Sequence, residues 1–136
     1  MNKPTVLFLC THNAGRSQMA LGFFAHLAGE QAVAYSGGSE PADQVNPSAV
    51  AAMAERGIDI TAEHPKRWTN EMVNDADVVV TMGCADTCPF VPGRRYEDWG
   101  LADPAGQPVD AVRPIRDEIE ARVRRLLDEL GVTTAR

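Results

Sequence analysis

The chain has 136 residues, which suggests a single domain (residues 1–136) with a sizeable core, and its 44% hydrophobic and 24% charged residues are ordinary for a globular protein. The net charge of −6 gives no reason to expect a nucleic acid or a membrane surface as partner. No apolar run approaches the roughly 20 residues of a membrane span, and the N-terminus lacks a secretion signal. Three cysteines are too few for a disulfide scaffold, so we expect a cytoplasmic protein whose thiols are kept for reactivity.

Strands and helices alternate along the N-terminal half. In chain order we predict a buried strand at 5–9, a helix between Ser17 and Gly29, a strand at 32–36 and a helix between Asn46 and Gly57. Ser17 is the predicted N-cap of the first helix, and Gly37-Gly38 the predicted end of the second strand. Asn46 can cap the second helix, and Pro47 suits its first position.

The C-terminal half continues the alternation. It contains a predicted short helix at 69–73, a strand at 77–82, a loop at 83–94, a weak strand at 95–97, a loop at 99–108 and a last helix at about 110–130. We therefore expect a three-layer α/β fold with a four-stranded parallel sheet flanked by helices. Ligands bind at the carboxyl ends of the strands in such sheets, and three chemical groups, Cys10, Cys84 and Asp103, follow predicted strands there.

The heptapeptide from Cys10 to Arg16, Cys-Thr-His-Asn-Ala-Gly-Arg, joins the first strand to the first helix. The loop can curl its backbone N–H groups around an anion, and the helix N-terminus adds positive potential. Arg16 supplies a fork for two oxygens of the anion. The same field favours the thiolate of Cys10, which the hydroxyl of Ser17 can hydrogen-bond, and a thiolate aimed at a bound tetrahedral oxyanion is a nucleophile in position. The candidate oxyanion-binding residues are Thr11, His12, Asn13, Ala14, Gly15 and Arg16.

The alternative for this loop is a cysteine that fills the end of a strand and an arginine that is a surface charge. The strand before, the helix after, the glycine in the loop and the serine that follows favour the catalytic interpretation.

Cys84 and Cys88 are four residues apart and are either two small core residues or a redox pair. A metal site is disfavoured because two thiols would need two more ligands, and His64 is the only other candidate that lies in a predicted loop. In a helical turn over 83–88 the two Cβ atoms would be about 5–6 Å apart. A disulfide needs about 3.8 Å, so oxidation would have to unwind the turn.

Asp103-Pro104 is the remaining candidate. A carboxylate on a loop beside the anion can give a proton to a leaving oxygen, whereas Asp-Pro also commonly begins a turn, and both interpretations stay open here. We expect His12 to be a solvated loop residue, and Trp68 and Trp99 to be packing residues.

Over nearly its whole length the chain resembles the arsenate reductases built on the low-molecular-weight tyrosine phosphatase fold. The loop alone would also fit phosphatases, but the added cysteines and the Asp-Pro-Ala-Gly run favour the reductases, because the phosphatases usually place aromatic residues after Asp-Pro. The resemblance rests on Cys10 to Arg16 with Ser17-Gln18-Met19-Ala20, Tyr35-Ser36, Val45-Asn46-Pro47, Val79-Val80-Thr81, and Trp99-Gly100 with Asp103-Pro104-Ala105-Gly106.

This resemblance implies an enzyme that reduces arsenate, and we expect it to act as a monomer and without a cofactor. Cys10 would attack arsenic, with Asp103 as proton donor, and Cys84 would then attack Cys10 to release arsenite. Cys88 would next attack Cys84, and thioredoxin would reduce the resulting Cys84–Cys88 disulfide. The thioredoxin-coupled relatives usually have a longer gap between these two cysteines than the three residues here.

Other outcomes remain open. A branch of the family uses mycothiol with a glutaredoxin-like partner and does not need the second and third cysteines. A phosphatase acting on phosphate monoesters would use Cys10 and Asp103, and a non-enzymatic oxyanion sensor would signal through disulfide formation. Some relatives bind potassium beside the loop; Asn13 and Ser36 match that site, but Leu21 stands where an acidic ligand is expected, so we expect no metal and weak or no potassium dependence.

Overall fold

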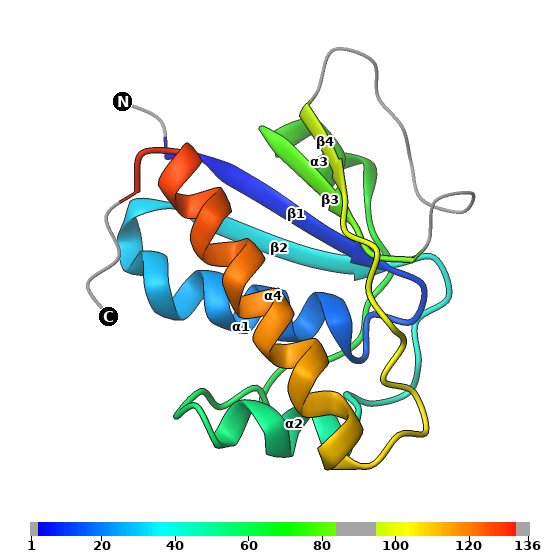
Figure 1. Cartoon of the computed structure of the whole chain (residues 1–136). Coiled ribbons are helices and arrows are strands. Elements are labelled where there is room, and N and C mark those ends of the chain that lie inside the picture. Colours follow the sequence, from blue (N-terminus) through cyan, green and yellow to red (C-terminus); the bar gives the residue numbers. More distant parts are fainter. Residues whose placement is uncertain (1–2, 84–94, 133–136) are drawn as a thin grey trace.

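A four-stranded parallel sheet forms the centre of the computed structural model, which describes residues 3–83 and 95–132 (Figure 1). The strands are β1 (Thr5–Cys10), β2 (Val33–Gly38), β3 (Val78–Thr81) and β4 (Arg95–Asp98), in the order β2-β1-β3-β4. The helices are α1 (Arg16–Ala28), α2 (Pro47–Ala54), α3 (Asn70–Asp75) and α4 (Val109–Glu129), with a 3-10 turn η1 at Gly29–Gln31. The predicted fold class is confirmed. Cys84 and Cys88 lie outside the described residues.

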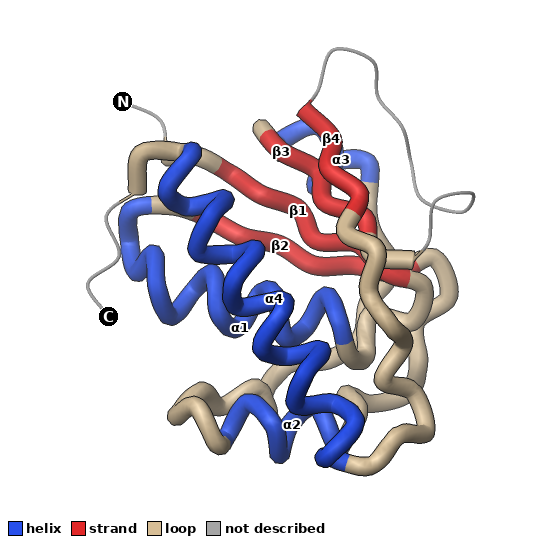
Figure 2. The backbone as a smooth tube through the Cα atoms, in the orientation of Figure 1, coloured by secondary structure: helices blue, strands red, loops and turns tan. Residues whose placement is uncertain are grey.

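The central strand β1 is buried on both faces, which explains its unbroken apolar run. Val6, Phe8 and Cys10 belong to the larger core, together with buried side chains of α1 and α4. These two helices lie on one face of the sheet (Figure 2). Leu7 and Leu9 face the other way and belong to a smaller core cluster with α3. Cys10 therefore ends a strand that packing holds from both sides.

Gly37 and Gly38 are the last two residues of β2 and pair with β1, so the predicted end of the strand after residue 36 is wrong. Gly38 is paired with Cys10 within the sheet, and a Cβ on Gly38 would lie 2.6 Å from the carbonyl oxygen of Thr11. A Cβ on Gly37 would lie 2.8 Å from the Cα of Trp68. Both glycines allow neighbouring backbone to approach the sheet closely.

Two arginines of α4 bind the carboxylate that follows α2. Glu55 accepts hydrogen bonds from Arg113 (Nη2–Oε2, 2.7 Å) and Arg116 (Nη1–Oε1, 2.7 Å), and buried Arg116 also donates to the carbonyl of Ala52. These hydrogen bonds, that from Arg113 first, lower the pKa of Glu55 from 4.5 to about 2. The cluster joins α2 to α4 beneath the sheet.

The depressed pKa of Glu55 predicts a pH-dependent stability. A group whose pKa is lower in the folded state stabilises the fold above its unfolded value, so this contribution should be lost as the pH falls from about 4.5 to about 2. Glu55→Gln should therefore lose less stability than the wild type over that interval in urea titrations. Glu30→Gln, at an exposed position in η1, is the control and should follow the wild type. Parallel curves for all three proteins would contradict the assignment.

The described helices include none that is both long enough and apolar enough to cross a membrane.

Candidate active site

Cys10 ends β1 with its sulfur in contact with a hydroxyl group. The residue is 2% exposed, and Sγ lies 2.8 Å from Oγ of Ser17. Asn13 donates from Nδ2 to the same Ser17 oxygen at 2.7 Å, which leaves the hydroxyl proton of Ser17 free to point at the sulfur. The hydroxyl of Ser17 can therefore donate a hydrogen bond to the sulfur of Cys10.

Ser17 contacts the sulfur of Cys10, as the sequence predicted, but it does not cap the first helix. Helix α1 begins at Arg16 with Gly15 as its N-cap, so Ser17 lies inside the first turn, and the N-cap prediction is wrong. The reason is that its side chain is buried against Cys10 and Asn13 rather than turned to the helix end.

Asn13 holds the loop from beneath. It is fully buried and has a positive φ of 51°, a conformation that asparagine tolerates better than most residues. Its Oδ1 accepts hydrogen bonds from the backbone N–H of Lys66 at 2.9 Å and from Nε2 of Gln18 at 3.2 Å. The side chain is fixed at both ends, so it can orient Ser17.

Four carbonyl groups of the loop are held by backbone N–H groups of other segments or of helix α1. They accept backbone hydrogen bonds at 2.8–3.0 Å, Thr11 from Glu40, His12 from Ala42, Ala14 from Asn46 and Gly15 from Met19. A trans peptide places its N–H opposite its carbonyl, so the N–H groups that follow these carbonyls point away from the partners that hold the carbonyls. The loop has the polarity of an anion cradle.

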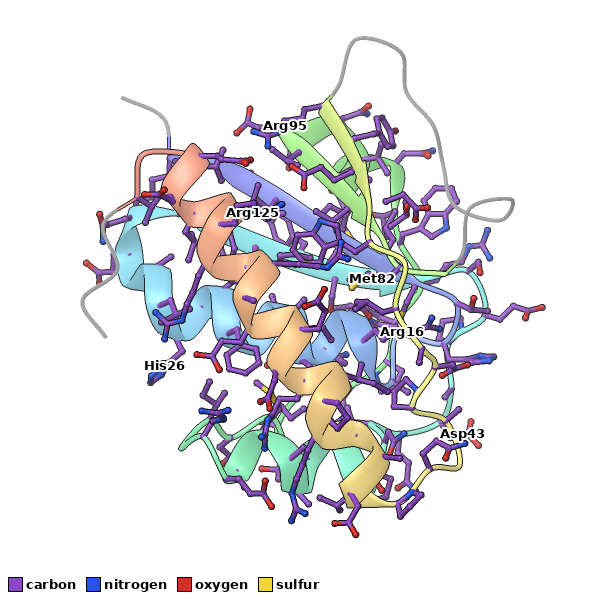
Figure 3. The ribbon with its side chains drawn as sticks, viewed as in Figure 1. Arg16, His26, Asp43, Met82, Arg95 and Arg125 are labelled. Carbon is purple, nitrogen blue, oxygen red and sulfur yellow. The ribbon has the colours of Figure 1, made fainter. Side chains whose placement is uncertain are left out.

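Arg16 lies where the start of α1 meets the loop after β4 (Figure 3). The residue is 7% exposed, and Nη1 donates to the carbonyl of Leu101 at 3.3 Å. Nη2 lies 3.7 Å from Oδ2 of Asp103, whose side chain is about half exposed. Asp103 also begins a turn, since its Oδ1 accepts from the N–H of Ala105 at 3.0 Å. Asp103 therefore both begins a turn and places its carboxyl beside Arg16, so the two interpretations of the sequence are compatible.

One small pocket brings these groups together. It places the thiol, the guanidinium and the carboxyl on a shared surface, with Ser17 and Asn13 beneath it and the exposed His12 at its side. Cys84 and Cys88 are not described. The pocket is lined by Cys10, His12, Ala14, Gly15, Arg16, Asn46, Asp103, Pro104 and Ala105.

A family model described as "Low molecular weight phosphotyrosine protein phosphatase" matches residues 5–135. The chain belongs to this family. It is 42% identical over 127 residues to arsenate reductase 2 of Staphylococcus haemolyticus, a match that covers 90% of this chain and 95% of that protein. The family resemblance predicted from the sequence is thereby confirmed.

Two solved structures extend the comparison with this phosphatase family. A thioredoxin-dependent arsenate reductase of Corynebacterium glutamicum superposes with a TM-score of 0.82 at 38% identity, covering 96% of this chain; the chain spans 63% of that protein's length. An arsenate reductase in a phosphate-binding state gives a TM-score of 0.82 at 33% identity, covering 93% of this chain and 98% of the other.

Asn46 lines the pocket, although the sequence predicted for it only the role of a helix cap and a place in the Val45-Asn46-Pro47 motif. It does cap α2, since its Oδ1 accepts from the N–H of Ser48 at 2.8 Å. Its backbone N–H donates to the carbonyl of Ala14 at 2.8 Å, and its Nδ2 donates to the carbonyl of Pro104 at 3.1 Å. Asn46 thereby joins the anion loop, α2 and the turn that carries Asp103.

Asn46→Asp should separate the capping role of Asn46 from its contact with the turn that carries Asp103. The carboxylate keeps the cap at the helix N-terminus but has no donor for Pro104 and adds negative charge to the pocket. We expect affinity for inorganic phosphate, measured by calorimetry, to fall by about tenfold or more with little change in melting temperature. Asn70→Asp, which adds the same charge at the exposed start of α3, should leave the affinity unchanged. Equal affinities in all three proteins would show that Asn46 does not shape the pocket.

The predicted weak potassium dependence stays a prediction. Oδ1 of Asn13 already accepts two hydrogen bonds, and Leu21 has no ligating atom. The buried Ser36 hydroxyl has no hydrogen-bond partner among the described residues. Over 3–83 and 95–132, no three His, Cys, Asp or Glu side chains gather as a metal site.

Proposed function

We propose that the chain reduces arsenate to arsenite, with Cys10 as the nucleophile. The observation that carries the proposal is the meeting of Cys10, Arg16 and Asp103 in one pocket, in a chain whose relatives include arsenate reductases. Arsenate binds with its oxygens toward the loop N–H groups and the fork of Arg16. Cys10 then lies directly behind the arsenic atom, with the hydroxyl of Ser17 on its sulfur.

The first chemical step exchanges an oxygen for a sulfur on arsenic. The thiolate of Cys10 attacks arsenic and forms an As–S bond, while one As–O bond breaks and its oxygen leaves as water. Asp103 supplies a proton to that oxygen, and its half-exposed carboxyl regains one from solvent. Arsenic keeps its oxidation state until the second thiol acts.

The second thiol supplies the reduction. Cys84 attacks the sulfur of Cys10, the As–S electron pair passes to arsenic, and arsenite leaves with a Cys10–Cys84 disulfide behind it. Cys88 attacks Cys84, freeing Cys10, and thioredoxin reduces the Cys84–Cys88 bond. Gly83, the residue before Cys84, supports this relay because its carbonyl accepts a hydrogen bond from Oγ1 of Thr11 at 3.3 Å, beside Cys10. The Corynebacterium glutamicum neighbour, which is thioredoxin-dependent, supports the choice of reductant. We propose a cytoplasmic monomer without a cofactor.

A phosphatase is the second candidate, and the name of the family model favours it. The pocket would take a phosphate monoester in place of arsenate, with Asp103 protonating the leaving oxygen and Cys84 and Cys88 protecting the nucleophile by oxidation. Rapid hydrolysis of an aryl phosphate that survives Cys84→Ser would favour this function over the reductase.

Counting thiols tests the reductase directly. One equivalent of arsenate added to the reduced protein, with no other thiol present, should lower the free thiols from three to one and release one arsenite. Cys88→Ser should fall from two thiols to none, because the relay then stops at Cys10–Cys84. A count that stays at three would overturn the relay, and activity restored by mycothiol would then assign the external-thiol branch.

A further inference from the structure

Gly83 lies directly against the guanidinium of Arg16. It follows β3 with a φ of +84°, in the left-handed region. A Cβ on Gly83 would overlap Nη1 of Arg16 and lie 3.1 Å from Cζ and 3.3 Å from Nη2. These two residues are 67 positions apart in the sequence, so the contact is made only by the fold.

The arginine has little room to move away from a side chain at position 83. Its Nη1 is already bonded to the carbonyl of Leu101, its Nη2 faces Asp103, and the residue is 7% exposed. Moving the guanidinium away from a side chain at position 83 would disturb these contacts.

The backbone of Gly83 is equally restrained. Its carbonyl accepts from Oγ1 of Thr11, and the preceding Met82 is fully buried and donates its N–H to the carbonyl of Leu9 at 2.8 Å. A side chain on Gly83 would therefore push Arg16 rather than the strand end.

We propose that Gly83 is a positioning residue for the oxyanion fork. By lacking a side chain it lets the guanidinium lie between the end of β3 and the loop at 101–103, where its fork can contact two oxygens of the anion. The inference rests on the proposed oxyanion pocket. It also connects oxyanion binding with the proposed thiol relay, because Gly83, which leaves room for Arg16, directly precedes Cys84 in the chain.

The competing explanation is that Gly83 serves only its positive φ. Gly57, which follows α2, provides the comparison, since it has a φ of +74° and no atom within 4 Å of its would-be Cβ. An alanine at either position carries the same kind of backbone strain. Only the alanine at position 83 meets Arg16.

The experiment measures binding of inorganic phosphate to the fully reduced protein by calorimetry, in Gly83→Ala, Gly57→Ala, Arg16→Lys and the Gly83→Ala/Arg16→Lys double variant. We expect Gly83→Ala to raise the dissociation constant about tenfold or more, and Gly57→Ala to leave it within about twofold of the wild type. In the Arg16→Lys background, Gly83→Ala should add less than about twofold, because the fork it displaces is gone.

The outcomes separate the two proposals. A wild type that binds no phosphate overturns the oxyanion pocket itself. Wild-type affinity in Gly83→Ala, equal losses in both glycine variants, or fully additive effects with Arg16→Lys overturn the role of Gly83. If Gly83→Ala fails to fold while the Gly83→Ala/Arg16→Lys double variant folds, that result supports the collision with Arg16. If neither of these two variants folds while Gly57→Ala does, the collision is overturned.

Discussion

Cys10→Ser should lose arsenate reduction to below detection, a fall of at least about 10³-fold, while phosphate affinity stays within about threefold of the wild type. The serine oxygen is close in size to the sulfur and keeps its hydrogen bond with Ser17, so the pocket should survive. It is not ionised near neutral pH and cannot form a disulfide, so neither the attack on arsenic nor the relay can proceed. Steady-state reduction assays with thioredoxin, together with calorimetry, measure the two effects.

Cys88→Ser is the matched control for this prediction. In the proposed relay this thiol acts only after arsenite has left, so a single turnover should survive and only recycling by thioredoxin should be lost. Multiple turnovers by Cys10→Ser would show that another residue is the nucleophile.

Arg16→Lys should lower kcat/KM for arsenate by about 10²–10³-fold, the range found when one preorganised donor to a developing oxyanion is removed. An ammonium group keeps the charge but loses the planar fork, and it cannot make two parallel contacts to the anion while also contacting Leu101 and Asp103. Steady-state kinetics with thioredoxin measure the loss.

Arg125→Lys is the control for Arg16→Lys, because Arg125 is exposed on α4, away from the pocket (Figure 3). It should leave kcat/KM unchanged. A similar small effect in both variants would mean that positive charge alone, rather than the fork, holds the anion.

The sheet and the nucleophile loop were predictable because their signals are local. The apolar runs of β1 and β3 identify buried strands, and the chain order of strand, loop and helix places Cys10 at a carboxyl edge. Asn46 and Pro47 identify the start of α2 for the same reason, since capping involves residues close in sequence.

The contacts that complete the site have no such local signal. Asn46 and Pro104 are 58 positions apart, and the glycines at 37, 38 and 83 are required by backbone or side chains from distant segments. A glycine that ends a strand and one that allows a close approach look the same in sequence, which is why Gly37-Gly38 was assigned wrongly. Ser17 was assigned to two roles, and only burial shows that it faces the sulfur.

The hydrogen bonds of the loop carbonyls have a consequence for competition between anions in the cell. Because Glu40 and Ala42 already hold the backbone of the proposed oxyanion loop, we expect an anion to pay little for ordering it, and we expect tetrahedral oxyanions of similar size and charge to bind alike. Abundant phosphate would then be a competitive inhibitor with respect to arsenate. Selectivity would then arise after binding, because arsenic and phosphorus differ in how readily they form a bond with sulfur. The rate of arsenate reduction would depend on the ratio of the arsenate and phosphate concentrations rather than on the arsenate concentration alone.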